Sequence, residues 1–115
     1  MKGAPASHIK TGPAGKRVRV TFKGEVIADS ARAIALKEGS YPVVYYLPRE
    51  DTKMAKLVPT SHRTHCPFKG DASYFSLGDK ENAVWSYENP FDDMLAIKGM
   101  LAFYPDKVDS IMVGE

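Results

Sequence analysis

The stretch of sequence that decides the fold is residues 72–87, which read ASYFSLGDKENAVWSY. Its two ends, Ala72–Leu77 and Ala83–Tyr87, contain aromatic and β-branched residues, which favour strands. The five residues between them begin with glycine and are otherwise polar, as expected for a turn. Trp85 lies two positions before the end of the second strand, so it shares a face with Tyr87. The stretch therefore predicts two consecutive strands with an aromatic face.

On the N-terminal side, the clearest further strand is Arg17–Lys23, where valine or phenylalanine alternates with polar residues. Gly24 then permits a tight turn, and Glu25–Ala28 is expected to return as the second arm of a hairpin. Ala31–Lys37 fits either a short helix or a third strand. Val43–Leu47 is a continuous apolar run, which predicts a strand buried on both faces.

The elements expected between and beyond these strands are short. They are a strand at Leu57–Thr60, a turn at Cys66–Gly70, helical turns over residues 91–95, and strands at Met100–Tyr104 and Lys107–Val113. Many short strands at this spacing predict an all-β fold with two antiparallel sheets, arranged as a sandwich or a partly open barrel.

Composition narrows the class of protein. The chain has 115 residues, of which 43% are hydrophobic and 26% charged, as in an ordinary soluble domain. We expect a flexible N-terminal lead over residues 1–15, which are rich in small residues and proline, and one domain over residues 16–115. No apolar run is long enough for a membrane span or a signal peptide, so we expect a cytoplasmic protein without membrane contact.

Charge does not point to nucleic acid as a partner. The net charge is only +2. Residues 1–23 hold six basic residues and no acidic one, which leaves ten basic and fourteen acidic residues for the rest. Because Arg17 and Arg19 alternate with valines, we interpret them as the solvent face of a strand rather than as a phosphate-binding arm.

Familiar cofactor and metal motifs are missing from the sequence. It contains neither a G-x-x-x-x-G-K-[ST] phosphate loop nor a G-x-G-x-x-G turn. His62, His65 and Cys66 form H-x-x-H-C, but in an extended segment His65 points away from the other two. Cys66 is the single cysteine, so the chain can form no internal disulfide. We therefore expect neither a metal nor a cofactor.

The candidate site lies in residues 41–87, where aromatic and charged residues follow predicted strands. Such an aromatic wall is either plain core or the lining of a small-molecule site, where polar groups converge on an apolar cavity. We expect Asp51 to hold Arg49 or Lys69 in place by a charge-assisted hydrogen bond. The ligand-binding candidates are Tyr46, Arg49, Asp51, Thr64, Tyr74, Trp85 and Tyr87.

Four ordered motifs in the chain resemble a known family. They are YYLPRED at residues 45–51, THCPFKGDASY at residues 64–74, AVWSYENP at residues 83–90, and AFY at residues 102–104 followed by Val108. Together they resemble the family called domain of unknown function 427, which is also labelled nucleotidyltransferase-like. The resemblance covers about residues 8–113.

The resemblance implies a fold of the Mss4-like, or β-tent, type. In such folds two antiparallel sheets are joined near one edge and open toward the other. Similar folds include methionine sulfoxide reductases of the B type and the ligand-binding domain of cereblon, and many relatives bind zinc through two C-x-x-C pairs. Cys66 is alone here, so that zinc site is not carried over.

Two functions from different classes are consistent with these residues. The first is a domain that binds a small molecule, such as a nucleotide or another anionic metabolite, in an aromatic cleft with Arg49 and Lys69. The second is an enzyme in which a Cys66 thiolate is the nucleophile or Lys69 stabilises developing negative charge. A protein-interaction domain is a third alternative for which the sequence offers no distinct feature.

Overall fold

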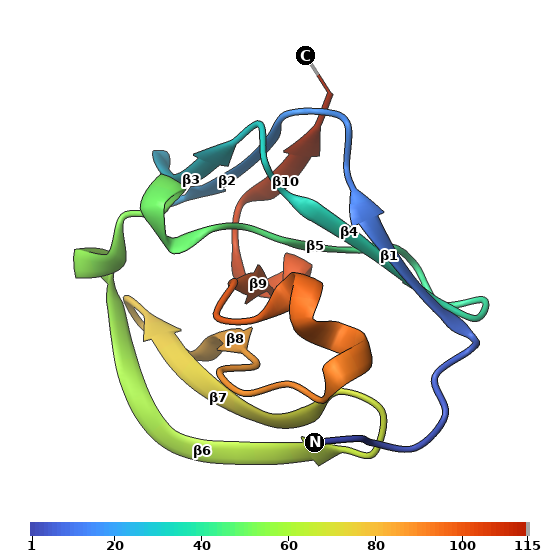
Figure 1. Cartoon of the computed structure of the whole chain (residues 1–115). Helices are drawn as coiled ribbons and strands as arrows, with labels where there is room; N and C mark the ends of the chain where they lie inside the picture. Colours follow the sequence, from blue (N-terminus) through green and yellow to red (C-terminus); the bar gives the residue numbers. More distant parts are fainter. Residues whose placement is uncertain (115) are drawn as a thin grey trace.

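A computed structural model describes residues 1–114 of the chain. Within these residues the strands form three antiparallel sheets and no closed barrel (Figure 1). One sheet has the order β1–β4–β5, with strands at Ile9–Pro13, Ile34–Glu38 and Val44–Tyr46. The second has the order β10–β2–β3, with strands at Ser110–Val113, Val18–Phe22 and Glu25–Ser30. The third has the order β6–β7–β8–β9, with strands at Leu57–Cys66, Gly70–Leu77, Lys80–Ser86 and Ala102–Phe103.

The connections between strands are short 3-10 turns and loops, so the all-β class is confirmed. The turns lie at Arg49–Asp51, Met54–Lys56, Asp92–Ile97 and Pro105–Lys107. The helical turns expected over residues 91–95 belong to the third of these, where Met94 and Ile97 are buried. Leu95 is 55% exposed, so it is not part of the buried face that its spacing suggested.

Three sheets form instead of two because one long hairpin is bent. Strands β1 and β4 pair from Ile9–Glu38 to Pro13–Ile34, and the pairing of β2 with β3 follows in nearly the same register. Between the two halves, residues 15–17 make no ladder with residues 31–32, and Gly15 has a φ of +71°. That positive φ suits glycine and turns the ribbon. Strand β5 then extends the half formed by β1 and β4, and β10 extends the half formed by β2 and β3.

The N-terminal segment differs from the flexible lead expected over residues 1–15. Ile9–Pro13 forms β1, and Ile9 is only 6% exposed in the core. Strand β4 also settles the choice at Ala31–Lys37 in favour of a strand. The pairing of β1 with β4 was hidden in the sequence because Gly12 and Pro13 interrupt any alternating pattern. Glu115, the last residue of the predicted domain, lies outside the described residues.

Two tight hairpins form where the sequence predicts them, and the second has a shorter turn than expected. Strands β2 and β3 are joined through Lys23 and Gly24, which both have positive φ, as a type I′ turn requires. Valine and phenylalanine on one face of β2 are buried, while Arg19 on the other face donates to Asp29. Strands β7 and β8 pair at Leu77 and Lys80, so their turn is Gly78–Asp79, shorter than the five residues expected.

Strands β5 and β6, which both lie at sheet edges, differ in length from the strands predicted there. The predicted strand Val43–Leu47 is shorter and only partly buried: β5 is an edge strand, and Val43 is 39% exposed. Strand β6 is much longer than the predicted Leu57–Thr60 and runs through Pro59. Because β6 is also an edge strand, the missing N–H of proline costs it little. Figure 1 shows β6 sweeping around the outside of the third sheet.

Buried side chains form two clusters, and the second one positions the site. The first cluster is mainly aliphatic, is called the aliphatic cluster below, and lies mainly around β2, β3, β7 and β8. The second is rich in aromatic residues and joins the sheet β1–β4–β5 to the sheet β6–β9. Its aromatic members, buried or partly buried, are Tyr46, Phe68, Tyr74, Trp85, Tyr87 and Tyr104.

Candidate functional site

A cavity of about 460 Å³ opens between the sheet β1–β4–β5 and the sheet β6–β9. We call it the aromatic pocket. Four of the seven predicted ligand-binding residues line it: Tyr46, Tyr74, Trp85 and Tyr87. Lys69, one of the two predicted catalytic residues, lines it as well. The structure thus brings together residues from β5, β7 and β8 and from the turn before β7.

One wall of the aromatic pocket is a contact across the two sheets. Tyr46 ends β5 and is 1% exposed, while Trp85 on β8 is half-buried. Their rings meet edge to face with centroids 6.3 Å apart, and Trp85 Nε1 donates to the Tyr46 hydroxyl at 3.2 Å. Burial raises the pKa of Tyr46, so its hydroxyl stays neutral and keeps its own proton.

Tyr104 extends this wall beyond the residues predicted from the sequence. Its ring lies 4.5 Å from that of Trp85. Burial first, and the neighbouring Tyr74 second, raise the pKa of Tyr104 to about 12. The Tyr74 hydroxyl lies 2.8 Å from Thr64 Oγ1, which places Thr64 behind the wall rather than in the lining. Sequence reasoning missed Tyr104, although it belongs to the closing AFY motif.

At the polar end of the aromatic pocket, Lys69 is held by Glu38. Lys69 Nζ lies 2.9 Å from Glu38 Oε1, and their side chains are only 12% and 22% exposed. Lys69 Nζ also donates to Cys66 Sγ at 3.9 Å and lies 6.0 Å from the centre of the Tyr87 ring. Burial raises the pKa of Tyr87. Glu38 was not predicted, because its strand pairs with β1 and no local pattern links it to Lys69.

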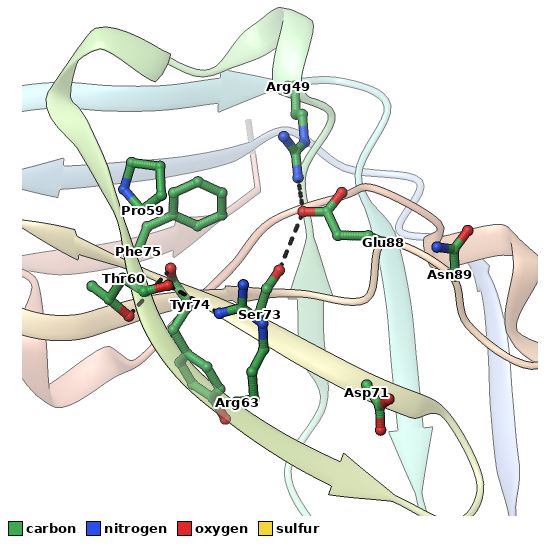
Figure 2. A pocket seen from close by; sticks show the side chains of 10 residues that line it. All are labelled: Arg49, Pro59, Thr60, Arg63, Asp71, Ser73, Tyr74, Phe75, Glu88 and Asn89. Atoms are coloured by element: carbon green, nitrogen blue, oxygen red, sulfur yellow. Dashed lines mark hydrogen bonds and ion pairs between the residues drawn. The ribbon is translucent and has the colours of Figure 1, made fainter.

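Arg49 lies in a different cleft. This cleft has a volume of about 480 Å³ and is lined on one side by Tyr74, which it shares with the aromatic pocket. Arg49 Nε donates to the Gly99 carbonyl at 2.7 Å, and Nη2 forms an ion pair with Glu88. Figure 2 shows Ser73 pointing to the same Glu88 carboxylate, at 3.3 Å. The two predicted cations therefore do not converge on one ligand.

Asp51 does not hold Arg49 or Lys69, which corrects the sequence-based expectation. Its Oδ2 accepts from Ser30 Oγ at 2.6 Å and from Arg32 Nη2 at 3.2 Å. These bonds, that of Ser30 first, lower the pKa of Asp51. Arg49 and Asp51 are two positions apart in a 3-10 turn with about three residues per turn, so their side chains diverge. Carboxylates from β4 and from the loop after β8 pair with the two cations instead.

The H-x-x-H-C segment on β6 is spread over separate contacts. His62 packs edge-on against the Tyr74 ring at 4.6 Å, and His65 Nδ1 lies 2.6 Å from Asp71 Oδ1. Cys66, at the end of the strand, packs against the aromatic cluster. Within residues 1–114, no group of three or more histidine, cysteine, aspartate and glutamate side chains is arranged to hold a metal ion.

Comparison with protein families matches the chain over residues 10–114 to the model named NTP_transf_9, described as a domain of unknown function, DUF427. The chain belongs to the DUF427 family. The DUF427 match includes β1, in agreement with the pairing of that strand in the structure. No curated protein matches the chain. Among the described residues, no helix of this DUF427 domain is long and apolar enough to cross a membrane.

Proposed function

We propose that the chain is a binding domain for a small molecule with a planar ring, which enters the aromatic pocket. The observation that supports this proposal is a cavity of about 460 Å³ walled by tyrosine and tryptophan rings from two sheets. Small-molecule sites are concave and mostly apolar, with a few converging polar groups.

The chemistry of the walls favours a ring as the ligand. Trp85 and Tyr104 offer ring faces, and Tyr46 offers a hydroxyl next to them. Stacking of a planar ring on such a wall contributes about 1–3 kcal/mol per ring when the wall is part of a nucleic-acid site. A nucleobase or a similar heterocycle has the right shape for this wall.

The single tryptophan makes the proposal directly testable. Trp85 lines the aromatic pocket, so titration with adenosine or nicotinamide is expected to change its fluorescence in a saturable way. Isothermal titration calorimetry then gives the affinity. Tyr104→Leu is expected to weaken binding about tenfold, the equivalent of about 1.4 kcal/mol of lost stacking.

The matched control for that variant is Tyr45→Leu. Tyr45 is also a half-buried tyrosine, but it packs against the aliphatic cluster and does not line the aromatic pocket. It is expected to leave the affinity unchanged. Absence of saturable binding of either compound, or equal losses in the two variants, contradicts the proposal.

An enzyme is the second candidate, and one distance favours it. Lys69 Nζ lies 3.9 Å from Cys66 Sγ, where an ammonium stabilises a thiolate nucleophile. If Cys66 has this role, a mild disulfide reagent reacts with it at neutral pH faster than with a free thiol, and Lys69→Gln removes the difference. A rate equal to that of the free thiol, or reaction only on unfolding, contradicts the proposal that Cys66 is an enzyme nucleophile.

For the fold we propose the Mss4-like, or β-tent, type. The bent hairpin supports it, since it sends its halves into two sheets that are joined at the bend. An experimental structure that superposes strand for strand on the B-type methionine sulfoxide reductases supports this assignment, and a different strand order in the sheets contradicts it.

A further inference from the structure

The charges that face the aromatic pocket balance each other. Of the described residues that line it, Lys69 is the one cation and Glu38 the one anion. Glu38 lies on β4 and Lys69 in the turn between β6 and β7, and they meet at 2.9 Å, where both side chains are mostly buried. The Lys69 ammonium is thus already paired before any ligand enters.

Glu38 also faces a second base. Its other oxygen, Oε2, lies 3.5 Å from His8 Nε2, and His8 packs edge to face on Phe68 with ring centroids 4.5 Å apart. Arg49, the other predicted cation, belongs to the neighbouring cleft and is paired with Glu88. An anionic ligand in the aromatic pocket therefore meets the Glu38 carboxylate at short range, while the one cation among the lining residues is already paired.

An uncharged ligand meets no such opposition and finds both kinds of hydrogen-bonding partner. Tyr46 accepts from Trp85, and no hydrogen bond within residues 1–114 uses the hydrogen of its own hydroxyl. Lys69 has three N–H donors, of which contacts with Glu38 and Cys66 occupy two. The Glu38 carboxylate has lone pairs left as acceptors. A ring with an amide-like edge can use donors and acceptors together.

From this arrangement we propose that the aromatic pocket selects uncharged planar heterocycles with an amide-like or amidine-like edge over anionic relatives of the same ring, and that Glu38 determines this selectivity. The inference rests on the proposed function, and it replaces the anionic ligand expected from the sequence by a neutral one. Glu38 acts by repelling an anion and by occupying the ammonium that would otherwise attract it.

Two ring-matched pairs of probes test the selectivity: nicotinamide against nicotinate, and adenosine against adenosine 5′-monophosphate. Calorimetric titration at neutral pH is expected to show the neutral member of each pair binding at least about tenfold more tightly to the wild-type chain. Glu38→Gln leaves Lys69 unpaired, and we expect it to remove or reverse that preference. Glu81→Gln is the matched control, since Glu81 is exposed and outside the aromatic pocket.

A second variant keeps the test decisive if Glu38→Gln does not fold. Lys69→Gln retains a hydrogen-bonding group and leaves the Glu38 carboxylate in place. It is expected to weaken the anionic probes further, while the neutral probes stay within about threefold of wild type, since the glutamine amide still offers them a hydrogen-bond donor.

The outcomes separate this inference from the proposed function. Binding of neither member of either pair overturns both. Saturable binding with equal or tighter affinity for nicotinate and adenosine 5′-monophosphate overturns the selectivity alone. A wild-type preference that Glu38→Gln and Glu81→Gln leave equally unchanged overturns the role of Glu38.

Discussion

The ion pair between Glu38 and Lys69 should be energetically coupled in the folded chain, and a double-mutant cycle measures that coupling. The two charged atoms lie 2.9 Å apart, and the side chains are 22% and 12% exposed. At this distance the gross attraction is about 6 kcal/mol for an effective dielectric constant of about 20. Desolvation of both groups offsets most of it, so the net value of a charge-assisted hydrogen bond, about 1.5–3 kcal/mol, is the better guide.

The single variants are not expected to be equal. Glu38→Gln leaves the more deeply buried ammonium without its carboxylate and should cost about 3 kcal/mol. Lys69→Gln leaves Glu38 with His8 nearby and with more access to water, so it should cost about 2 kcal/mol. The double variant removes both charges and should cost about 3 kcal/mol rather than the sum, which gives a coupling of about 2 kcal/mol.

Urea unfolding followed through Trp85 fluorescence measures all four free energies, because the chain has one tryptophan. The pair Lys23–Asp79 is the control: its atoms are 3.0 Å apart, but its side chains are 62% and 64% exposed. Its cycle should show no measurable coupling, since solvent screens exposed pairs. Additivity of the Glu38 and Lys69 variants within about 0.5 kcal/mol would refute the reasoning.

Three further predictions concern the fold and its pH dependence. Gly78→Ala should lower the free energy of unfolding more than Gly39→Ala: both positions have positive φ, but only at position 78 would the new Cβ lie 2.9 Å from the Phe22 ring. Equal losses in the two urea curves would exclude that clash. Asp51→Asn should lower the melting temperature and leave adenosine affinity within about twofold, because Asp51 binds Ser30 and Arg32 away from the aromatic pocket. A tenfold loss of affinity would show instead that Asp51 contributes to ligand binding. The pKa of Tyr104 is raised from 10.0 to about 12 in the folded chain, so its contribution to stability is complete below pH 10 and is lost as pH rises toward 12. Unfolding free energies that stay constant between pH 9 and pH 12 would contradict this shift.

Local patterns were enough to predict the elements that depend on neighbours in sequence. The alternation in β2 and the glycine after it specify the hairpin with β3, because a turn of two residues sets the register by itself. The aromatic face of β8 is likewise a consequence of spacing by two. Strand β1 was missed because Gly12 and Pro13 mask its pattern and its partner β4 is distant in the sequence. Strand β6 was shortened because Pro59 interrupts it and the residues after Thr60 are polar.

The sequence by itself determined the all-β class, the family motifs and four aromatic residues of the candidate site. Tertiary structure decided which charges face the aromatic pocket. Lys69 is there and Arg49 is not, and Glu38 rather than Asp51 is the carboxylate that matters. The physical reason is the bend of the long hairpin, which places β4 beside the sheet of β6, β7, β8 and β9. Glu38 thereby contacts Lys69, which lies 31 residues away in the sequence. An ion pair between a strand and a distant turn depends on that long-range geometry, which no local spacing of residues encodes.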